Sequence, residues 1–540
     1  MSGNSIFDYI VVGGGSAGCV LANRLSADPA VRVCLIEAGP TDASALAQVL
    51  TRIPAAIAAL IRSPRYNYQY VYEAEERLGG RTIPIPRGRI LGGTSSINGM
   101  VYMRGHPLDY DGWAALGNVG WRYAEVLPFF KLSERWHGET SSFHGSQGEL
   151  DISPPRDPHP ICEDFFRAAD SMGYRRNDDF NGVVQDGFGY FHLTQRNGER
   201  VSTSRAFLGP ARHRGNLVVM TDTLARRIVV DEGKRATGVV VRGVGGDAII
   251  KARREIILSA GAINSPQLLM LSGIGPGDHL RDHGIEVIQH LPGVGENLQD
   301  HQNIRMQFSS GNPRLYGLSA QALPWIVRSP FSYITARKGP LTSNLVEACG
   351  YVKSNPDLAQ PDLQLCVAPG FLDESAHAIP RGHGFSFNVT LMQSKSKGRL
   401  TLASNDPASS PIMSAQFLAH GEEVQALIRG VRLVRRLVAA PSMRAWQGVE
   451  TEPGVAQDTD DELGQHIVSN VGTAFHPVGT CKMGIDPMAV VDHTLAVRGI
   501  HSLRVADASI MPFVISGNTN APTIMIAEKL SAELTATSHQ

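Results

Sequence analysis

Residues 7–18 read FDYIVVGGGSAG, and this stretch decides the fold of the N-terminal part of the chain. The apolar run 7–12 is typical of a buried parallel strand, and the glycines match the G-x-G-x-x-G pattern that opens a helix. Such a turn lets a pyrophosphate approach the backbone, where helix N–H groups hold it. A second strand, 31–36, ends at Glu37, which lies 19 residues after Gly18, where a ribose needs an acceptor. We therefore predict a unit that binds FAD or NAD, because Glu37 would repel the 2′-phosphate of NADP.

Three further segments favour FAD over NAD. Residues 87–100 form a glycine- and hydroxyl-rich stretch with two arginines, which indicates an ordered loop against a ligand. Residues 254–262 and 503–509 each predict a strand that ends in small residues or an acid. A nicotinamide enzyme normally completes its cofactor site within one compact N-terminal domain. Contributions from both ends of the chain therefore suit the longer FAD.

A histidine and an asparagine near the C-terminus are the candidate catalytic pair. His476 stands between an aromatic residue and a proline in TAFHPVGTCK (473–482), so its backbone is extended. A histidine can take a proton near neutral pH, and Asn518 offers a donor and an acceptor without ionising. The two could remove the proton of an alcohol while holding its oxygen. The chain has 18 histidines, so a buried core role for His476 is the alternative.

These motifs, in this order, resemble the glucose-methanol-choline (GMC) oxidoreductase family over essentially the whole chain. The two family signatures correspond to residues 87–100 and 261–276, and the run 291–301 also matches. Within the family, residues 342–348 and 517–528 are most similar to bacterial choline dehydrogenases and aliphatic primary-alcohol dehydrogenases.

The resemblance implies the reaction and the roles of the pair. His476 is similar to the family's active-site base, and Asn518 stands where the family has a second histidine or an asparagine. The implied reaction oxidises a primary alcohol to an aldehyde, with hydride transfer to flavin N5 and a non-NAD electron acceptor such as a quinone. Ile97 occupies the position at which some members attach FAD through a histidine, so we expect non-covalent FAD. Asn520 is expected to be structural or to face the flavin.

The motifs and the resemblance together define a candidate cofactor site, and no metal site is expected. Its members are Gly13, Gly15, Ser16, Ala17, Gly18, Glu37, Ala38, Arg89, Gly92, Gly93, Thr94, Asn98, Gly99, Met100, Val101, Ala225, Ala260, Gly261, Asp507, Ala508, Asn518, Thr519 and Asn520.

The substrate side is less determined by the sequence. Glu347 lies in a segment resembling the family region that supplies a carboxylate to the trimethylammonium group of choline, and a structural carboxylate is the alternative. Phe475 stands beside the base, where a choline site would favour an aromatic cage. The apolar stretch 316–333 is open to three interpretations: a lid over a tunnel, a surface that contacts a membrane, or an ordinary packed helix or loop.

Several activities remain compatible with these residues. The first is an FAD-dependent alcohol dehydrogenase that uses a quinone or dye as acceptor, and choline dehydrogenase is a variant of it. The second is an alcohol oxidase that uses O₂. A lyase that keeps FAD structurally, as hydroxynitrile lyases of this fold do, is the third, and a non-catalytic flavin-binding module is the fourth.

Length and composition place these motifs in a two-domain α/β protein. The 540 residues exceed one ordinary core, and 50 basic against 51 acidic residues disfavour a nucleic-acid partner. We expect a Rossmann-like FAD-binding domain from 1–155, 200–310 and 466–540. The segments 156–199 and 311–465 would form an α+β substrate domain on an antiparallel sheet. No apolar run is long enough to span a membrane, so we expect a cytoplasmic protein, with peripheral contact at the inner membrane face left open.

Overall fold

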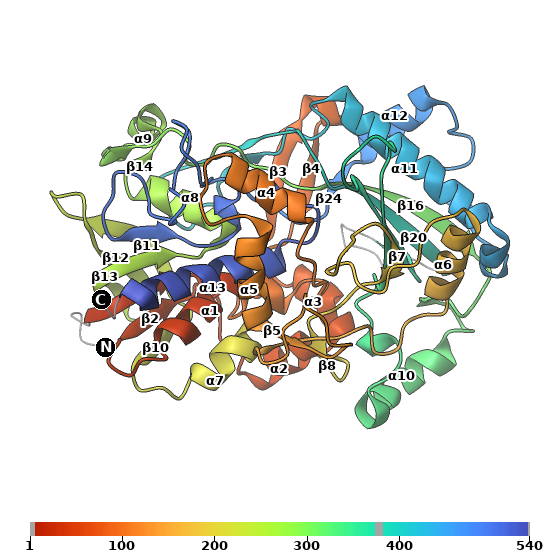
Figure 1. Cartoon of the computed structure of the whole chain (residues 1–540), viewed down its shortest axis with the longest axis horizontal. Coiled ribbons are helices and arrows are strands. Elements are labelled where there is room, and N and C mark those ends of the chain that lie inside the picture. The colour runs from red at the N-terminus through yellow and green to blue at the C-terminus, as the bar shows by residue number, and fades with distance from the viewer. Residues whose placement is uncertain (1–5, 373–381, 538–540) are drawn as a thin grey trace.

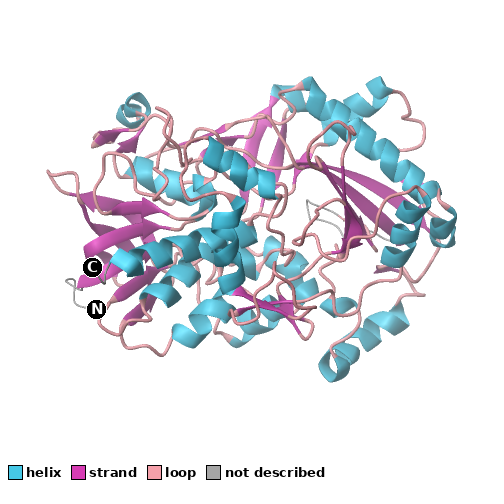
Figure 2. Cartoon of the chain, viewed as in Figure 1, coloured by secondary structure: helices cyan, strands magenta, loops and turns pink. Residues whose placement is uncertain are grey.

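Two large β-sheets organise the protein, one mainly parallel and one antiparallel. The structure, a computed structural model, describes residues 6–372 and 382–537. The ends of the expected FAD-binding domain (1–5 and 538–540) and residues 373–381 of the expected substrate domain lie outside the described residues. The first sheet lies beside the two chain ends, and the second lies at the opposite side of the molecule (Figure 1; Figure 2).

The first sheet contains the predicted dinucleotide-binding strands. Its parallel strands, in spatial order, are β10 (Leu217–Met220), β2 (Val33–Ile36), β1 (Ile6–Val12), β13 (Gly246–Leu258) and β25 (Leu503–Val505). The antiparallel strands β11 (Leu224–Val230) and β12 (Ala236–Gly243) extend it from β13. The register aligns Val12 with both Ile36 and Leu258, and Leu258 with Val505. Segments from both chain ends therefore finish at one edge of the sheet, where doubly wound folds bind their ligands.

Helix α1 (Ser16–Leu25) begins directly at the glycine turn and packs against the C-terminal helix α13 (Asn520–Thr537). Gly13 has φ +104°, which favours glycine. A Cβ at Gly18 would lie 1.8 Å from the carbonyl oxygen of Gly13. The last glycine of the motif therefore allows the helix to approach the strand. Helix α5 (Tyr123–Ser133) packs on α13, and α8 (Gly261–Leu271) follows β13.

The second sheet is antiparallel throughout. Its order is β23 (Val449–Glu452), β16 (Gln302–Ser310), β20 (Gly382–Leu391), β19 (Leu363–Ala368), β18 (Ala348–Val352) and β7 (Gly187–Tyr190), with β24 (Gly472–Thr473) beside β16 and β17 (Gly317–Leu318) beside β20. The alternating apolar residues Phe385, Phe387, Val389 and Leu391 are buried on β20. Helix α11 (Gly421–Ala439) covers β19 and β20 and contacts α6 (Ile161–Ser171) and α12 (Asp460–Asn470).

Strand β16 shows where the chain passes from one sheet to the other. Its residues fall within the segment 200–310 that we assigned to the FAD-binding domain, yet they pair in the second sheet. The proposed division into domains stays a prediction. Smaller elements surround the sheets: α2 (Ala45–Arg52), η1 (Pro54–Ala56), α3 (Ile57–Arg62), β3 (Tyr70–Glu75), β4 (Arg81–Ile85), α4 (Pro107–Ala115), α10 (Leu323–Ala336) and η5 (Pro340–Thr342).

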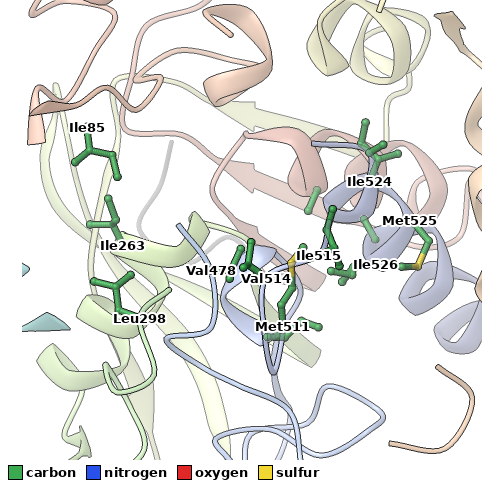
Figure 3. Close-up of a cluster of buried hydrophobic side chains, with 14 of the residues drawn as sticks. Ile85, Ile263, Leu298, Val478, Met511, Val514, Ile515, Ile524, Met525 and Ile526 are labelled. Atoms are coloured by element: carbon green, nitrogen blue, oxygen red, sulfur yellow. The ribbon is translucent and has the colours of Figure 1, made fainter. Parts of the chain in front are cut away.

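The segments that carry the candidate catalytic pair are anchored in the apolar core. Figure 3 shows Val478, two residues after His476, among the side chains of Met511, Val514 and Ile515. The backbone N–H groups of Gly479 and Cys481 donate to the carbonyls of Ala508 and Ser509. A rigid core therefore fixes both loops relative to each other.

Candidate active site

A cavity of about 730 Å³ joins the edge of the first sheet to one face of the second. This volume is typical of small-molecule and cofactor sites. Most of the expected cofactor residues line it: Gly13, Gly15, Ser16, Ala17, Glu37, Ala38, Gly93, Thr94, Asn98, Gly99, Met100, Val101, Ala225, Ala260, Gly261, Asp507, Ala508, Asn518, Thr519 and Asn520. Polar residues of β16, β19 and β20 line its other end: Asn303, Gln364, Asn388 and Thr390.

Three expected cofactor residues lie behind the cavity wall. Gly18 provides the close packing of α1 described above. Gly92 has φ +88° and donates its N–H to the carbonyl of Gly14 at 2.7 Å, which holds the 87–100 loop against the glycine turn. The guanidinium of Arg89 lies over the ring of Tyr68. These residues shape the cavity without lining it.

The carboxylate of Glu37 connects the ends of β1 and β2. Its two oxygens accept the N–H groups of Gly14 at 2.9 Å and Gly39 at 2.7 Å. Burial raises the pKa of Glu37 to about 7, and the two backbone hydrogen bonds oppose this rise. Each oxygen still has a second lone pair for a ligand. Glu37 therefore stabilises the glycine turn and lines the part of the cavity expected to hold a ribose.

The cavity wall has the features that a bound dinucleotide requires. A Cβ added at Gly99 or Gly261 would meet no described atom within 4 Å, so both backbones face open space. The Oδ1 atoms of Asn344 and Asn518, two residues of the cavity lining, are buried without a described partner. Open glycine backbone and unpaired polar groups fit a large polar cofactor.

His476 and Asn518 meet in this cavity, 42 residues apart in the chain. The amide Nδ2 of Asn518 lies 3.0 Å from His476 Nε2. An amide nitrogen donates, so Nε2 accepts and carries no proton. On the other side, Nδ1 of His476 lies 2.9 Å from Nδ1 of His301. The hydrogen between the two rings therefore belongs to His476 Nδ1, which donates a hydrogen bond to His301 Nδ1.

Asp300 fixes the loop that carries His476. One carboxylate oxygen accepts the backbone N–H of His476 at 2.7 Å, and the other accepts the hydroxyls of Tyr72 at 2.7 Å and Thr473 at 2.6 Å. Phe475, the residue before the histidine, has φ +67° and presents its carbonyl to Arg87. A strained backbone position held by several partners is common at functional sites.

The surroundings of His476 keep its imidazole neutral. Burial lowers the pKa of His476 well below 6.5, and His301 and the charge of Arg87 lower it further. Burial also lowers the pKa of His301 to about 4. A buried, uncharged imidazole whose Nε2 carries no proton can act as a general base beside the cavity.

The sequence did not single out Asp300 or His301 as parts of this site, and it placed Arg87 only in the loop 87–100 expected against a ligand. Asp300 and His301 lie in the run 291–301 that carried the family resemblance, which was the available signal. Nothing in the sequence indicated that this run contacts His476, which lies 175 residues beyond His301.

The two expected substrate residues lie in different surroundings. Phe475 lines the cavity beside His476. Glu347 is buried, and its carboxylate accepts the backbone N–H of His159 at 2.8 Å, just before helix α6. Residues 344–346 line the cavity, but Glu347 is absent from the described lining. The structure therefore gives Glu347 a partner outside the cavity lining, and its role stays a prediction.

A parallel dinucleotide-binding sheet with a neutral histidine at the same cavity defines a cofactor-dependent oxidoreductase. Comparison with known families places the chain within this class: the N-terminal model of the GMC oxidoreductases matches residues 7–303, and the C-terminal model matches 394–527. The chain belongs to the GMC oxidoreductase family. FAD is the cofactor, in agreement with the cavity wall described above.

Individual relatives support this assignment over nearly the whole chain. The protein is 42% identical to an alcohol dehydrogenase (acceptor) of Pseudomonas putida, over 97% of this chain and 94% of the relative. It is equally similar to an oxygen-dependent choline dehydrogenase of Rhizobium etli, with the same coverage. Among solved structures, pyridoxine 4-oxidase from Mesorbium loti superposes with a TM-score of 0.88 at 31% identity, covering 98% of this chain and 99% of that one.

Proposed function

We propose that this protein oxidises an uncharged alcohol, preferably primary, to an aldehyde and passes the electrons to a non-NAD acceptor such as a quinone. The observation that carries the proposal is the His476–Asn518 pair, which lines the same cavity as the dinucleotide-binding motifs. The relatives named as an alcohol dehydrogenase and a choline dehydrogenase support the same reaction class.

The protein groups would perform the proton chemistry. When bound, FAD supplies a hydride acceptor. Nε2 of His476 would take the hydroxyl proton and Asn518 Nδ2 would donate to the alcohol oxygen, once a substrate hydroxyl replaces the hydrogen bond that the two atoms make to each other. His301 holds the imidazole and Asp300 holds the backbone of residue 476, which would lower the entropy cost of reaching the reactive geometry.

The charges of the cavity favour an uncharged substrate over choline. Within the described part of the lining, the acids are Glu37 and Asp507, and both accept backbone N–H groups at the nucleotide end. Glu347 is directed toward helix α6 instead. The polar residues of the second sheet that face the cavity are neutral, for example Asn388 and Thr390. Among the described residues, a quaternary ammonium group would therefore find no ion partner to replace its lost hydration.

Anaerobic mixing with a panel of alcohols tests the function. We expect primary alcohols to bleach the flavin absorbance band, and choline to bleach it far more slowly at equal concentration. Bleaching by no alcohol would support the lyase or the non-catalytic flavoprotein instead. Admitting air to the reduced enzyme and measuring peroxide separates an oxidase from a dehydrogenase that needs another acceptor.

We also propose that FAD is held without a covalent bond. Ile97 lines the cavity and is buried, and its side chain has no atom that could bond to the flavin. We expect acid or heat denaturation to release all FAD into the supernatant, as measured by absorbance after centrifugation. Yellow colour that stays with the precipitated protein would contradict this expectation.

A further inference from the structure

Helix α10 presents an unusually apolar face to solvent. Leu323, Val327, Phe331 and Ile334 are 59%, 67%, 72% and 73% exposed. Successive members are three or four residues apart, so they form one stripe along the helix. Soluble proteins rarely leave such a continuous apolar stripe without a partner. The helix stands at the periphery of the molecule, away from the first sheet (Figure 1).

The segment around this stripe carries positive charge only. Residues 312–346 contain no aspartate or glutamate, and they contain Arg314, Arg328, Arg337 and Lys338. Arg337 is paired with Glu199 at 3.2 Å. An apolar stripe with flanking basic side chains is typical of helices that lie in the interface of an anionic lipid bilayer.

Two short helices connect α10 to the wall of the cavity. The turn η5 follows α10 and packs against η1. η1 leads directly into α3, whose residues Ile57, Ala58 and Ile61 line the cavity. A surface bound through α10 would therefore lie near one end of the cavity.

We propose that α10 docks the protein on an anionic lipid membrane, with Leu323, Val327, Phe331 and Ile334 inserted and Arg328 and Lys338 at the headgroups. The docking would be peripheral, because no single helix in the described ranges is long and apolar enough to cross a bilayer. Helix α2 and the η1–α3 segment reach that length and apolar character only when they are combined, and the two are bent by 107° relative to each other.

A second copy of the chain fits this face less well than a lipid surface does. In a two-fold dimer the same patch meets itself. Here that arrangement would bring basic side chains against basic side chains, with no acid in residues 312–346 to pair with them. Anionic lipid supplies both the apolar phase and the opposite charge.

Flotation of the FAD-loaded enzyme with vesicles tests the docking. We expect the enzyme to float with vesicles of equal parts phosphatidylcholine and phosphatidylglycerol, and to float much less with phosphatidylcholine alone or at high salt. The double variant Val327→Ser/Phe331→Ser should lose most of the vesicle-bound fraction. The variant Val183→Ser/Val244→Ser, which changes two exposed valines elsewhere, should keep it.

The result is independent of the proposed reaction, because flavin reduction by alcohol in the absence of vesicles should be the same in all these variants. Unchanged flotation of Val327→Ser/Phe331→Ser would overturn the proposal, as would equal binding to neutral vesicles. A dimer in analytical ultracentrifugation that Phe331→Ser converts to a monomer, together with no flotation, would show that a second copy covers this face.

Discussion

His476→Ala should lower the rate of flavin reduction by an alcohol roughly 10²–10⁴-fold, which is the usual contribution of a positioned acid–base group. The variant should still bind FAD and fold, because a smaller side chain leaves the backbone N–H of residue 476 free to donate to Asp300. Anaerobic stopped-flow absorbance measures this rate directly. Reoxidation by an artificial acceptor should change little, because the imidazole acts on the substrate oxygen.

The matched variant Asn518→Ala should cause a smaller loss, because it removes one hydrogen-bond donor and leaves the base in place. If His476→Ala reduces its flavin at the wild-type rate, His476 is a buried core residue and the proton leaves by another route. The variant Asn518→Asp extends the same test. It would place a charged oxygen at the buried position where Asn518 Oδ1 has no described partner.

The pH dependence of wild-type reduction follows from the same surroundings. The base must be neutral to accept a proton, so the rate rises with pH through its pKa and then levels off. Burial, His301 and Arg87 lower the pKa of His476 well below 6.5. The rate of flavin reduction should therefore be constant around neutral pH and should decrease only at acidic pH. A steep rise of the rate between pH 6.5 and 8 would contradict this assignment.

Glu37→Ala should weaken FAD binding by about 1.5–3 kcal/mol, the range for a hydrogen bond to a charged group, which is roughly a 10- to 150-fold rise in Kd. The change removes an acceptor at the predicted ribose position. It also leaves the N–H groups of Gly14 and Gly39 without the partner that orders the glycine turn. Titration of the apoprotein with FAD, followed by flavin fluorescence, measures the effect.

Glu37→Gln provides the control, because it keeps one acceptor oxygen and the side-chain volume. Burial raises the pKa of Glu37 to about 7, so the carboxyl is already partly protonated near neutral pH and Gln should cost less than Ala. Equal FAD affinity in wild type and Glu37→Ala would mean that the end of the cavity beside Glu37 does not bind the nucleotide.

Local patterns were sufficient to predict the fold class and most of the cofactor cavity. The run 7–18 specifies strand, turn and helix through the positions of its apolar residues and glycines, which need no distant partner to be recognised. The carboxyl ends of β1, β2, β13 and β25 meet at one edge because parallel strands must finish together, so their terminal residues could be assigned to one ligand. His476 and Asn518 followed from the same order of motifs.

Only the tertiary structure decided what surrounds the base and where Glu347 points. Asp300 and His301 contact His476 across more than 170 residues of chain, and no local periodicity encodes that approach. Glu347 follows three residues that line the cavity, yet its carboxylate is directed to the start of α6. Side-chain direction and pKa depend on which elements pack together and how much water they exclude, and packing is a property of the whole chain.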